Sequence, residues 1–522
     1  MDKYYERIPQ EMFEFAQLDS EIHDEKFKTK ARGFFADAML RFKKNKSSVV
    51  AAYIIGFLIL FAIVSPLISE NVFHYTIEDK DNVYINAAPY IPSIAAKEWG
   101  IWDGSMTMNS QSQLQLDMLY AIGQETGLNP VIGEPVATER EEMYRGKPRK
   151  VYSYAVKVNT YYKVGVKNMV MSYSEFENIQ KWQNETGVQV IFPAVDKRDI
   201  YPSKIKDLSS IADNPNIWYQ CTDNKNTPKT DSNGNLVPAY CTDKEKEGAP
   251  YNSIRIEGDN GDYIYSIAKS GSVLVRVCYY NYFWYTHDSE PNFILGTDTY
   301  GRDLFCAIGK GARFSLIFAL FVSIINLSIG AFAGAYQGYY GGWVDLICQR
   351  LMEILSGMPF IVVTTLFQLY MAAKVGVVGA FLFAFVLTGW IGMANLTRKQ
   401  FYRFKGQEYV LAARTLGASD KRIMFKHIFP NALGTIITSC ALVIPGVISS
   451  ETSLTYLGIV DLSKFSGTSI GELMKNGQQT MTTSPHAMLY PSIFFSLLMI
   501  SFNLFGNGLR DAFNPSTRGT ED

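Results

Sequence analysis

The sequence predicts an all-α polytopic membrane protein with six transmembrane helices and an inserted extracellular α+β domain. The chain has 522 residues, a net charge of −1 and 47% hydrophobic residues, averages that would also suit a large soluble protein. The apolar residues, however, are concentrated in uncharged runs of the roughly 17–25 residues that cross a bilayer. These runs are residues 47–69, 314–336, 354–373, 375–397, 431–450 and a sixth within 487–509. Buried helices of a soluble protein need shorter runs, so six such runs indicate an integral membrane protein.

Basic residues set the orientation of the first span. Arg41, Lys43, Lys44 and Lys46 precede it, so the positive-inside rule places the N-terminal tail, residues 1–46, in the cytoplasm. The span starts late and follows an acidic leader, and no small-x-small cleavage site comes after it. We therefore expect a retained signal-anchor rather than a removed signal peptide.

The remaining crossings follow from this orientation. The loop after the fourth span, residues 399–430, has an excess of Lys and Arg, and four crossings return it to the cytoplasmic side. The C-terminal tail, residues 510–522, follows the sixth span and is expected on the same side. Residues 70–291 lie between the first two spans and are therefore expected outside, with residues 292–313 leading into the second span.

The external residues have the mixed pattern of an α+β domain. Strand patterns, by alternation or by β-branched and aromatic residues, occur at 150–158, 188–195 and 273–285. Short helices that end at a glycine are expected at 113–127 and 174–187. About 220 residues of this kind are enough for an independently packed domain.

Cys221 and Cys241 bracket a turn-rich stretch of the external domain. An oxidising exterior permits a disulfide, and closing a loop of about 20 residues would stabilise the fold by roughly 3 kcal/mol. The alternative is two reduced thiols, and the pattern favours the bridge. Packing roles are expected for Cys278, Cys306, Cys348 and Cys440.

The sequence contains no recognisable catalytic, metal-binding or nucleotide-binding motif. The five histidines are far apart, and neither His-Glu-x-x-His nor Cys-x-x-Cys spacing occurs, so no metal site is predicted. No G-x-x-x-x-G-K-[ST] loop occurs either, so we expect no cofactor in this chain, and no nucleic-acid partner is predicted. Asp345, Arg350 and Glu353 flank the third span, and charges inside the spans that would mark an ion relay are not expected.

The stretch EYVLAARTLGASDKRIMFKHIFP, residues 408–430, lies between the fourth and fifth spans. Its first part has good helix formers, and Gly417 is placed to end that helix in a left-handed conformation. Ser419 is placed to cap a second helix, and Pro430 to start the fifth span.

Two interpretations of this helix–turn–helix remain open. Ala412, Ala413, Gly417 and Ala418 leave the turn nearly bare of side chains, so the backbone of another protein would fit close to it. One interpretation is therefore a knob that fits a socket on a soluble partner. The other is an amphipathic loop that lies on lipid headgroups.

The stretch resembles the E-A-A-x-x-x-G signature loop of ABC importer permeases, a loop that docks on the ATPase subunit as a coupling helix in that family. Ala412, Ala413 and Gly417 match, whereas Leu411 replaces the leading Glu, and His427 and Phe429 replace the usual Ile and Leu. The resemblance makes these residues ATPase-coupling candidates: Glu408, Ala412, Ala413, Arg414, Gly417, Ala418, Ser419 and Pro430.

Further blocks resemble permeases for oligopeptides, dipeptides and nickel. They are LGTDTYGRDLF (295–305), GKGARFSL (309–316), GYYGGWVD (338–345), RLMEILSGMP (350–359) and SETSLTYLG (450–458). Glu353 stands where the family usually has Asp, and Thr452 where it has Ala. Two more candidate sets follow: Gly296, Thr297, Asp298, Gly301, Arg302 and Asp303 before the second span, and Glu451, Leu454, Leu457 and Gly458 for an outer gate.

The resemblance covers residues 47–69 and about 295–514. It implies the type I ABC importer permease fold, with a core at 314–509, in the C-type permease of an oligopeptide or dipeptide importer of a bacterial plasma membrane. The implied partners are a second homologous permease, two ATPase subunits that hold ATP and magnesium, an extracytoplasmic peptide-binding protein and membrane lipid. The family usually has only a short segment in place of residues 70–291. Because these residues sit where the binding protein must dock, their expected role is to hold or orient that protein, and the alternative is an accessory fold that stabilises the outer loop.

Alternative functions stay open at this stage. The same type of permease could carry nickel or another small solute, because the binding protein usually selects the substrate. A membrane-anchored external sensor, docking protein or enzyme would not explain the matched blocks in the membrane part. An ion channel is disfavoured because pore charges are missing.

Overall fold

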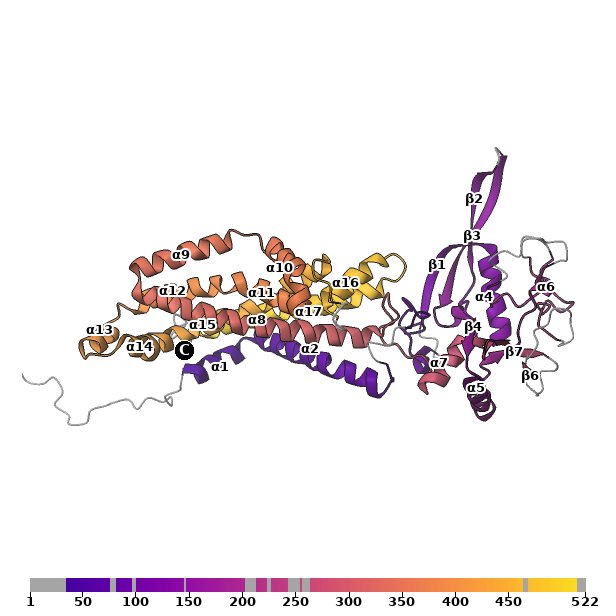
Figure 1. Ribbon diagram of the computed structural model, residues 1–522, viewed down its shortest axis with the longest axis horizontal. Coiled ribbons are helices and arrows are strands. Elements are labelled where there is room, and N and C mark those ends of the chain that lie inside the picture. The colour runs from indigo at the N-terminus through magenta and orange to yellow at the C-terminus, as the bar shows by residue number, and fades with distance from the viewer. Residues whose placement is uncertain are drawn as a thin grey trace, which may run out of the picture.

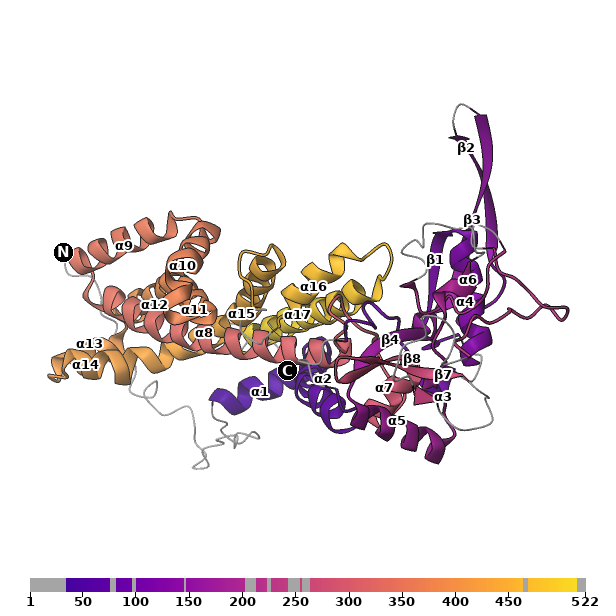
Figure 2. The same ribbon diagram turned by 45° about the vertical axis from the view of Figure 1, so that its right-hand side comes forward.

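A computed structural model describes residues 34–75, 81–95, 100–144, 147–201, 213–222, 227–242, 254–255, 263–462 and 468–513. The molecule is elongated, with long helices lying side by side along most of its length and a unit with β-sheets at one end (Figure 1). A β-ribbon projects sideways from this unit in both views (Figure 2).

The long helices are apolar enough to cross a membrane. Among the described residues five helices meet this condition by length and composition. They are α2 (Lys46–Asn71), α8 (Leu304–Tyr340), α11 (Val377–Gly389) with α12 (Ile391–Phe404), α14 (Asp420–Arg422) with the π-helical η4 (Ile423–Ile428) and α15 (Phe429–Tyr456), and α17 (His486–Phe513). The pair α9 (Gly342–Ser356) and α10 (Phe360–Val375) makes six when it is counted as one bent span.

The predicted third span, residues 354–373, is not one straight helix. It contains the break between α9 and α10, which are bent by 77° relative to each other. Pro359 lies in the break, where it lacks a backbone N–H and disfavours a helical conformation in the residue before it. The predicted fourth span begins at Val377, because Gly376 (φ +81°) separates α10 from α11. The first, second, fifth and sixth predicted spans lie wholly within helices.

The ends of the helices follow the predicted order of crossings. α17 ends beside α1 (Phe34–Lys44), where the rings of Phe42 and Phe505 lie 5.4 Å apart. α8 ends beside the 408–430 segment, which contains α13 (Glu408–Thr415) and α14. α1, α13 and α14 lie in the part of the bundle away from the sheets (Figure 1). The α+β unit follows the opposite end of α2 and precedes the start of α8.

The α+β unit contains two antiparallel sheets. The first has the strand order β1 (Ser105–Gln111), β3 (Lys147–Asn159) and β2 (Val136–Tyr144). The second has the order β4 (Val166–Met171), β8 (Ser272–Cys278), β7 (Ile264–Lys269) and β6 (Ile254–Arg255), and β5 (Ile191–Phe192) also pairs with β8. Its helical segments are α3 (Pro92–Ala95), α4 (Gln113–Thr126), η2 (Tyr162–Val164), α5 (Tyr173–Thr186), α6 (Lys197–Ile200) and α7 (Tyr279–His287).

Most local predictions for this unit are confirmed. Residues 150–158 lie within β3, and α4 and α5 end at Gly127 (φ +75°) and Gly187 (φ +71°). The predicted strand at 188–195 shrinks to the two residues of β5.

The predicted strand at 273–285 is correct only for its first half. β8 ends at Cys278, and the aromatic half forms α7. The reason is packing, because Tyr280 and Phe283, three residues apart on one helix face, are buried in a cluster with Tyr90, Tyr161 and other aromatic residues.

The predicted disulfide between Cys221 and Cys241 is wrong for this structure, in which both side chains are thiols. Tyr219 pairs with Pro238 in an antiparallel bridge. Cys221 follows Tyr219 and Cys241 follows Pro238, and because the two segments are antiparallel, the two cysteines lie on opposite sides of this bridge. Cys221 then pairs with Pro228, whereas the Cys241 amide donates a hydrogen bond to the carbonyl of Ala194. A disulfide needs Cα atoms roughly 4–7 Å apart, and this register separates them.

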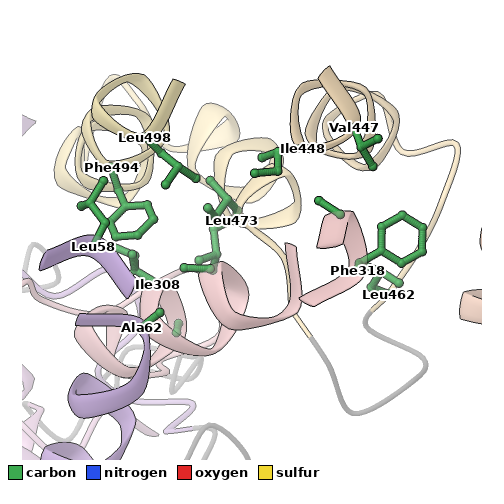
Figure 3. Packing of buried hydrophobic residues seen from close by; sticks show 14 of the residues in the cluster. Leu58, Ala62, Ile308, Phe318, Val447, Ile448, Leu462, Leu473, Phe494 and Leu498 are labelled. Atoms are coloured by element: carbon green, nitrogen blue, oxygen red, sulfur yellow. The ribbon is translucent and has the colours of Figure 1, made fainter. Parts of the chain in front are cut away.

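One apolar core is shared by α2, α8, α11, α15 and α17 and by the short helix α16 (Ile470–Gln479). Leu58 of α2 lies close to Ile308 of α8 and Phe494 of α17, and Leu473 of α16 points into the same region (Figure 3). Leu473 is only 1% exposed. α16 is therefore part of the bundle, and polar groups on it are buried with it.

Candidate functional site

The 408–430 segment forms the predicted helix–turn–helix. α13 ends at Thr415, and Gly417 adopts a left-handed conformation with φ +80°. The amide of Gly417 donates to Arg414 O and that of Ala418 to Ala413 O, which satisfies carbonyls at the end of α13. Ser419 occupies the N-cap position of α14, but its side chain makes no capping hydrogen bond.

The turn presents its bare side outward. Leu416 is 87% exposed, and a Cβ atom built on Gly417 would have no heavy atom within 4 Å. On the opposite side, Val410, Ile423 and Ile428 are fully buried in the bundle. All eight predicted coupling residues, from Glu408 to Pro430, are exposed or half-buried. The segment is thus held by one apolar face and leaves the glycine turn accessible.

Pro430 does not start the fifth span as predicted. The helix is continuous from Asp420 to Tyr456, and a π-helical turn, η4, directly precedes Phe429 and Pro430. A proline inside a helix removes a hydrogen bond and its ring clashes with the carbonyl four residues earlier. A wider turn at this place accommodates the ring without ending the helix.

In addition to apolar packing, two contacts of a polar or charged group attach the segment to the end of α8, and the sequence did not indicate them. The Tyr339 hydroxyl donates a 2.5 Å hydrogen bond to Asp420 Oδ1. The guanidinium of Arg414 lies 5.9 Å from the centre of the Tyr339 ring. Tyr339 belongs to the block GYYGGWVD, which was the available signal, but its contacts depend on the tertiary fold.

The six predicted motif residues before α8 form a tight turn. Thr297 is fully buried, accepts a 2.8 Å hydrogen bond from the Ala87 amide and donates one to the Tyr84 carbonyl. Asp298 and Arg302 form a buried ion pair of 2.7 Å. Asp303 caps α8 by accepting hydrogen bonds from the amides of Phe305 and Cys306.

This turn joins four parts of the chain. Ser69 at the end of α2 donates a 2.6 Å hydrogen bond to Asp303 Oδ2. His486 at the start of α17 lies 3.2 Å from the Thr297 carbonyl oxygen. Gly296 and Gly301 have positive φ, and a Cβ on Gly301 would collide with the Asp81 carbonyl. The motif is therefore a joint between the bundle and the segment that leads into the α+β unit.

The four outer-gate candidates fall into different environments. Glu451 and Leu454 are buried, Leu457 is 61% exposed, and Gly458 has φ +73°. The predicted span ended at residue 450, but α15 continues to Tyr456 and carries Glu451 inside the packed bundle. Glu451 is thus a buried ionisable side chain just beyond the end of the predicted span.

Glu451 is surrounded by hydroxyl groups. Ser315 of α8 donates a 2.7 Å hydrogen bond to its carboxyl group, and Thr452 and Thr455 lie 3.3 and 3.5 Å from its oxygens. Ser469, the N-cap of α16, in turn donates a 3.2 Å hydrogen bond to Thr455. The site links three helices, α8, α15 and α16, through hydroxyl and carboxyl groups. Among the described residues, no group of three or more His, Cys, Asp or Glu side chains could hold a metal ion.

Comparison with known proteins identifies the membrane part. Residues 315–519 match the family described as "Binding-protein-dependent transport system inner membrane component", and residues 33–89 match "N-terminal TM domain of oligopeptide transport permease C". The dipeptide transport system permease protein DppC of Bacillus subtilis is 37% identical over 225 residues, which cover 43% of this chain and 69% of the relative. The chain belongs to this family of transport permeases.

Other permeases show the same extent of similarity. The oligopeptide transport system permease protein OppC of B. subtilis is 36% identical over 43% of this chain and 72% of its own length. A chain of a solved methionine ABC transporter is 15% identical, with a TM-score of 0.31, and covers 40% of this chain and 96% of its own. Neither family model reaches residues 90–314, which contain almost all of the α+β unit. The permease family confirms the predicted type I importer fold, and the unit is an insertion into it.

Proposed function

We propose that this chain is the transmembrane permease subunit of an ATP-driven importer for oligopeptides or dipeptides. Relatives with more than two thirds of their length covered are named as dipeptide and oligopeptide transport permeases, which supports this substrate class over nickel. The observation that carries the proposal is the accessible Gly417 turn, held on the bundle by a buried apolar face. Such a turn suits a socket on an ATPase subunit.

In this mechanism the permease supplies a pathway and two ATPase subunits supply the energy. A second homologous permease forms the other half of the pathway, and an extracytoplasmic binding protein delivers the peptide. ATP and magnesium belong to the ATPase subunits, and this chain performs no chemistry of its own. The ATPase subunits must contact the 408–430 segment differently in the two conformational states of the pathway, inward-facing and outward-facing. Only such differential contact shifts a conformational equilibrium.

The test is Gly417→Glu, with Gly417→Ala as its matched control. Both variants carry the strain of a side chain at positive φ, roughly 1–2 kcal/mol, but only Glu adds bulk and charge at the turn. We expect Gly417→Glu to insert in the membrane normally and to lose co-purification of the ATPases and uptake of a labelled peptide. Gly417→Ala should retain most of both. Wild-type behaviour of Gly417→Glu would show that the segment is a lipid-facing loop, and uptake of nickel instead of peptide would change the substrate.

The proposed orientation places the α+β unit outside the cytoplasm of a bacterial cell and the 408–430 segment inside it. The arrangement of helix ends and the basic loop supports this orientation. Single cysteines at the exposed positions Ser174 and Ser419, in a chain without its native cysteines, should react oppositely with an impermeant thiol reagent on intact cells. Equal labelling at both positions would refute the orientation.

A further inference from the structure

The inner end of α8 contacts both helices of the 408–430 segment through one side chain. Tyr339, the last residue but one of α8, is 8% exposed and hydrogen-bonds Asp420 at the start of α14. Its ring also faces the guanidinium of Arg414 on α13. Tyr339 thus bridges the two sides of the Gly417 turn from a helix outside the segment.

Around this tyrosine, α8 and α12 are packed backbone to backbone. A Cβ on Gly330 would lie 2.6 Å from the Trp390 carbonyl oxygen, and one on Gly338 would lie 2.6 Å from Phe401 Cβ. Lys405, after α12, donates a 3.1 Å hydrogen bond to the Gly338 carbonyl. Such close packing leaves little room for α8 to slide on α12, because packed interiors transmit displacement rather than absorb it.

The polar cluster next to this seam fixes α9 to α12. The carboxylate of Asp345 on α9 accepts hydrogen bonds from Arg398 and Tyr402 on α12, with distances of 2.5 and 2.9 Å. The ends of α8, α9 and α12 are therefore one mechanical unit, and Tyr339 is its polar contact with the segment.

α8 extends from this unit to the other end of the bundle. Its 37 residues span about 55 Å at 1.5 Å per residue. At its far end, Asp303 caps the helix and holds Ser69 of α2. A displacement imposed at Tyr339 is thus carried along α8 to the joint that borders the α+β unit.

We propose that Tyr339 is the positioning residue through which the 408–430 segment moves α8, in addition to the covalent connection of that segment with α15. The proposal rests on the proposed function, since it assumes that ATPase subunits dock on the segment. Docking requires the outward face of the Gly417 turn, whereas transmission requires the inward contact between Tyr339 and Asp420. The two can therefore be separated by substitution.

The experiment compares Tyr339→Phe with Tyr340→Phe in the complete transporter reconstituted in liposomes. Tyr340 is the adjacent tyrosine, is 47% exposed, and its hydroxyl makes no hydrogen bond to a described residue. Loss of a hydrogen bond to a charged group shifts an equilibrium by roughly tenfold or more. We expect Tyr339→Phe to keep ATPase co-purification and to lower the peptide imported per ATP hydrolysed by about that factor, with Tyr340→Phe unchanged.

A second variant approaches the same hydrogen bond from its acceptor. Asp420→Ala should lower the same ratio, and the double variant Tyr339→Phe/Asp420→Ala should be no worse than Asp420→Ala alone, because both remove one interaction. A wild-type ratio in Tyr339→Phe would overturn the proposal, and so would loss of the ATPases from that variant. If the wild-type chain itself neither binds ATPases nor imports peptide, the proposed function fails instead.

Discussion

Ser315 of α8 donates a 2.7 Å hydrogen bond to the carboxyl group of Glu451 on α15, and both side chains are completely buried. At the other end of the same two long helices, Tyr339 of α8 contacts Asp420, from which the helix continues into α15. α8 and α15 are therefore joined by a polar contact near each end. Relative movement of the two helices must break or rearrange at least one of these contacts.

The contact between Ser315 and Glu451 predicts a non-additive effect on stability. Glu451→Leu removes the acceptor and leaves the Ser315 hydroxyl buried without it, which costs about 1–3 kcal/mol. Ser315→Ala in the same chain should recover part of this loss, because replacing both partners of a buried hydrogen bond by apolar groups is nearly neutral. The measurement is the temperature at which half of the purified protein remains monodisperse. Additive losses in the double variant would contradict a direct contact.

The joint before α8 predicts different costs at two glycines with the same backbone conformation. Gly301 (φ +73°) and Gly127 (φ +75°) both have positive φ, but only Gly301 faces another backbone atom, the Asp81 carbonyl oxygen. Gly127→Ala should therefore cost only the conformational strain, roughly 1–2 kcal/mol. Gly301→Ala should also displace residues 81–90 from the joint and therefore lower the thermal unfolding temperature more than Gly127→Ala does. Equal unfolding temperatures in the two variants would show that the joint tolerates the added atom.

The sequence was sufficient for those features that depend on neighbouring residues. The apolar runs predicted the long helices, and Gly127, Gly187 and Gly417 marked helix ends because each helix there needs a left-handed residue. The family blocks located the accessible turn and the motif before α8, although they did not show why those residues are required.

Features that depend on residues far apart in the chain were missed. The Tyr339 contact with Asp420 joins positions 81 residues apart, and the Ser315 contact with Glu451 joins positions 136 residues apart. α7 formed in place of a strand because its aromatic residues pack into a distant cluster, which overrides local β preference. The bridge between Cys221 and Cys241 failed for the same reason, since strand register is set by the whole unit.

The last prediction concerns pH and Glu472 on α16. This side chain is 6% exposed, and neither of its carboxylate oxygens has a hydrogen-bond partner among the described residues. Burial raises the pKa of Glu472 from 4.5 to about 7. The negative charges of Asp461 and Asp298 also raise this pKa, whereas the positive charges of Arg302 and Lys475 lower it. A raised pKa in the folded state means that the protonated form stabilises the fold. This contribution is complete below pH 4.5 and is lost as pH rises through 7. At about 1.4 kcal/mol per pKa unit it amounts to at most about 3.5 kcal/mol. Glu472→Gln should therefore remove the part of the stability loss that falls between pH 4.5 and 7, as measured by thermal unfolding at a series of pH values.

Glu185→Gln on the exposed surface of α5 is the control and should leave the dependence of stability on pH unchanged. An unchanged profile in Glu472→Gln would mean that Glu472 remains ionised in the folded protein.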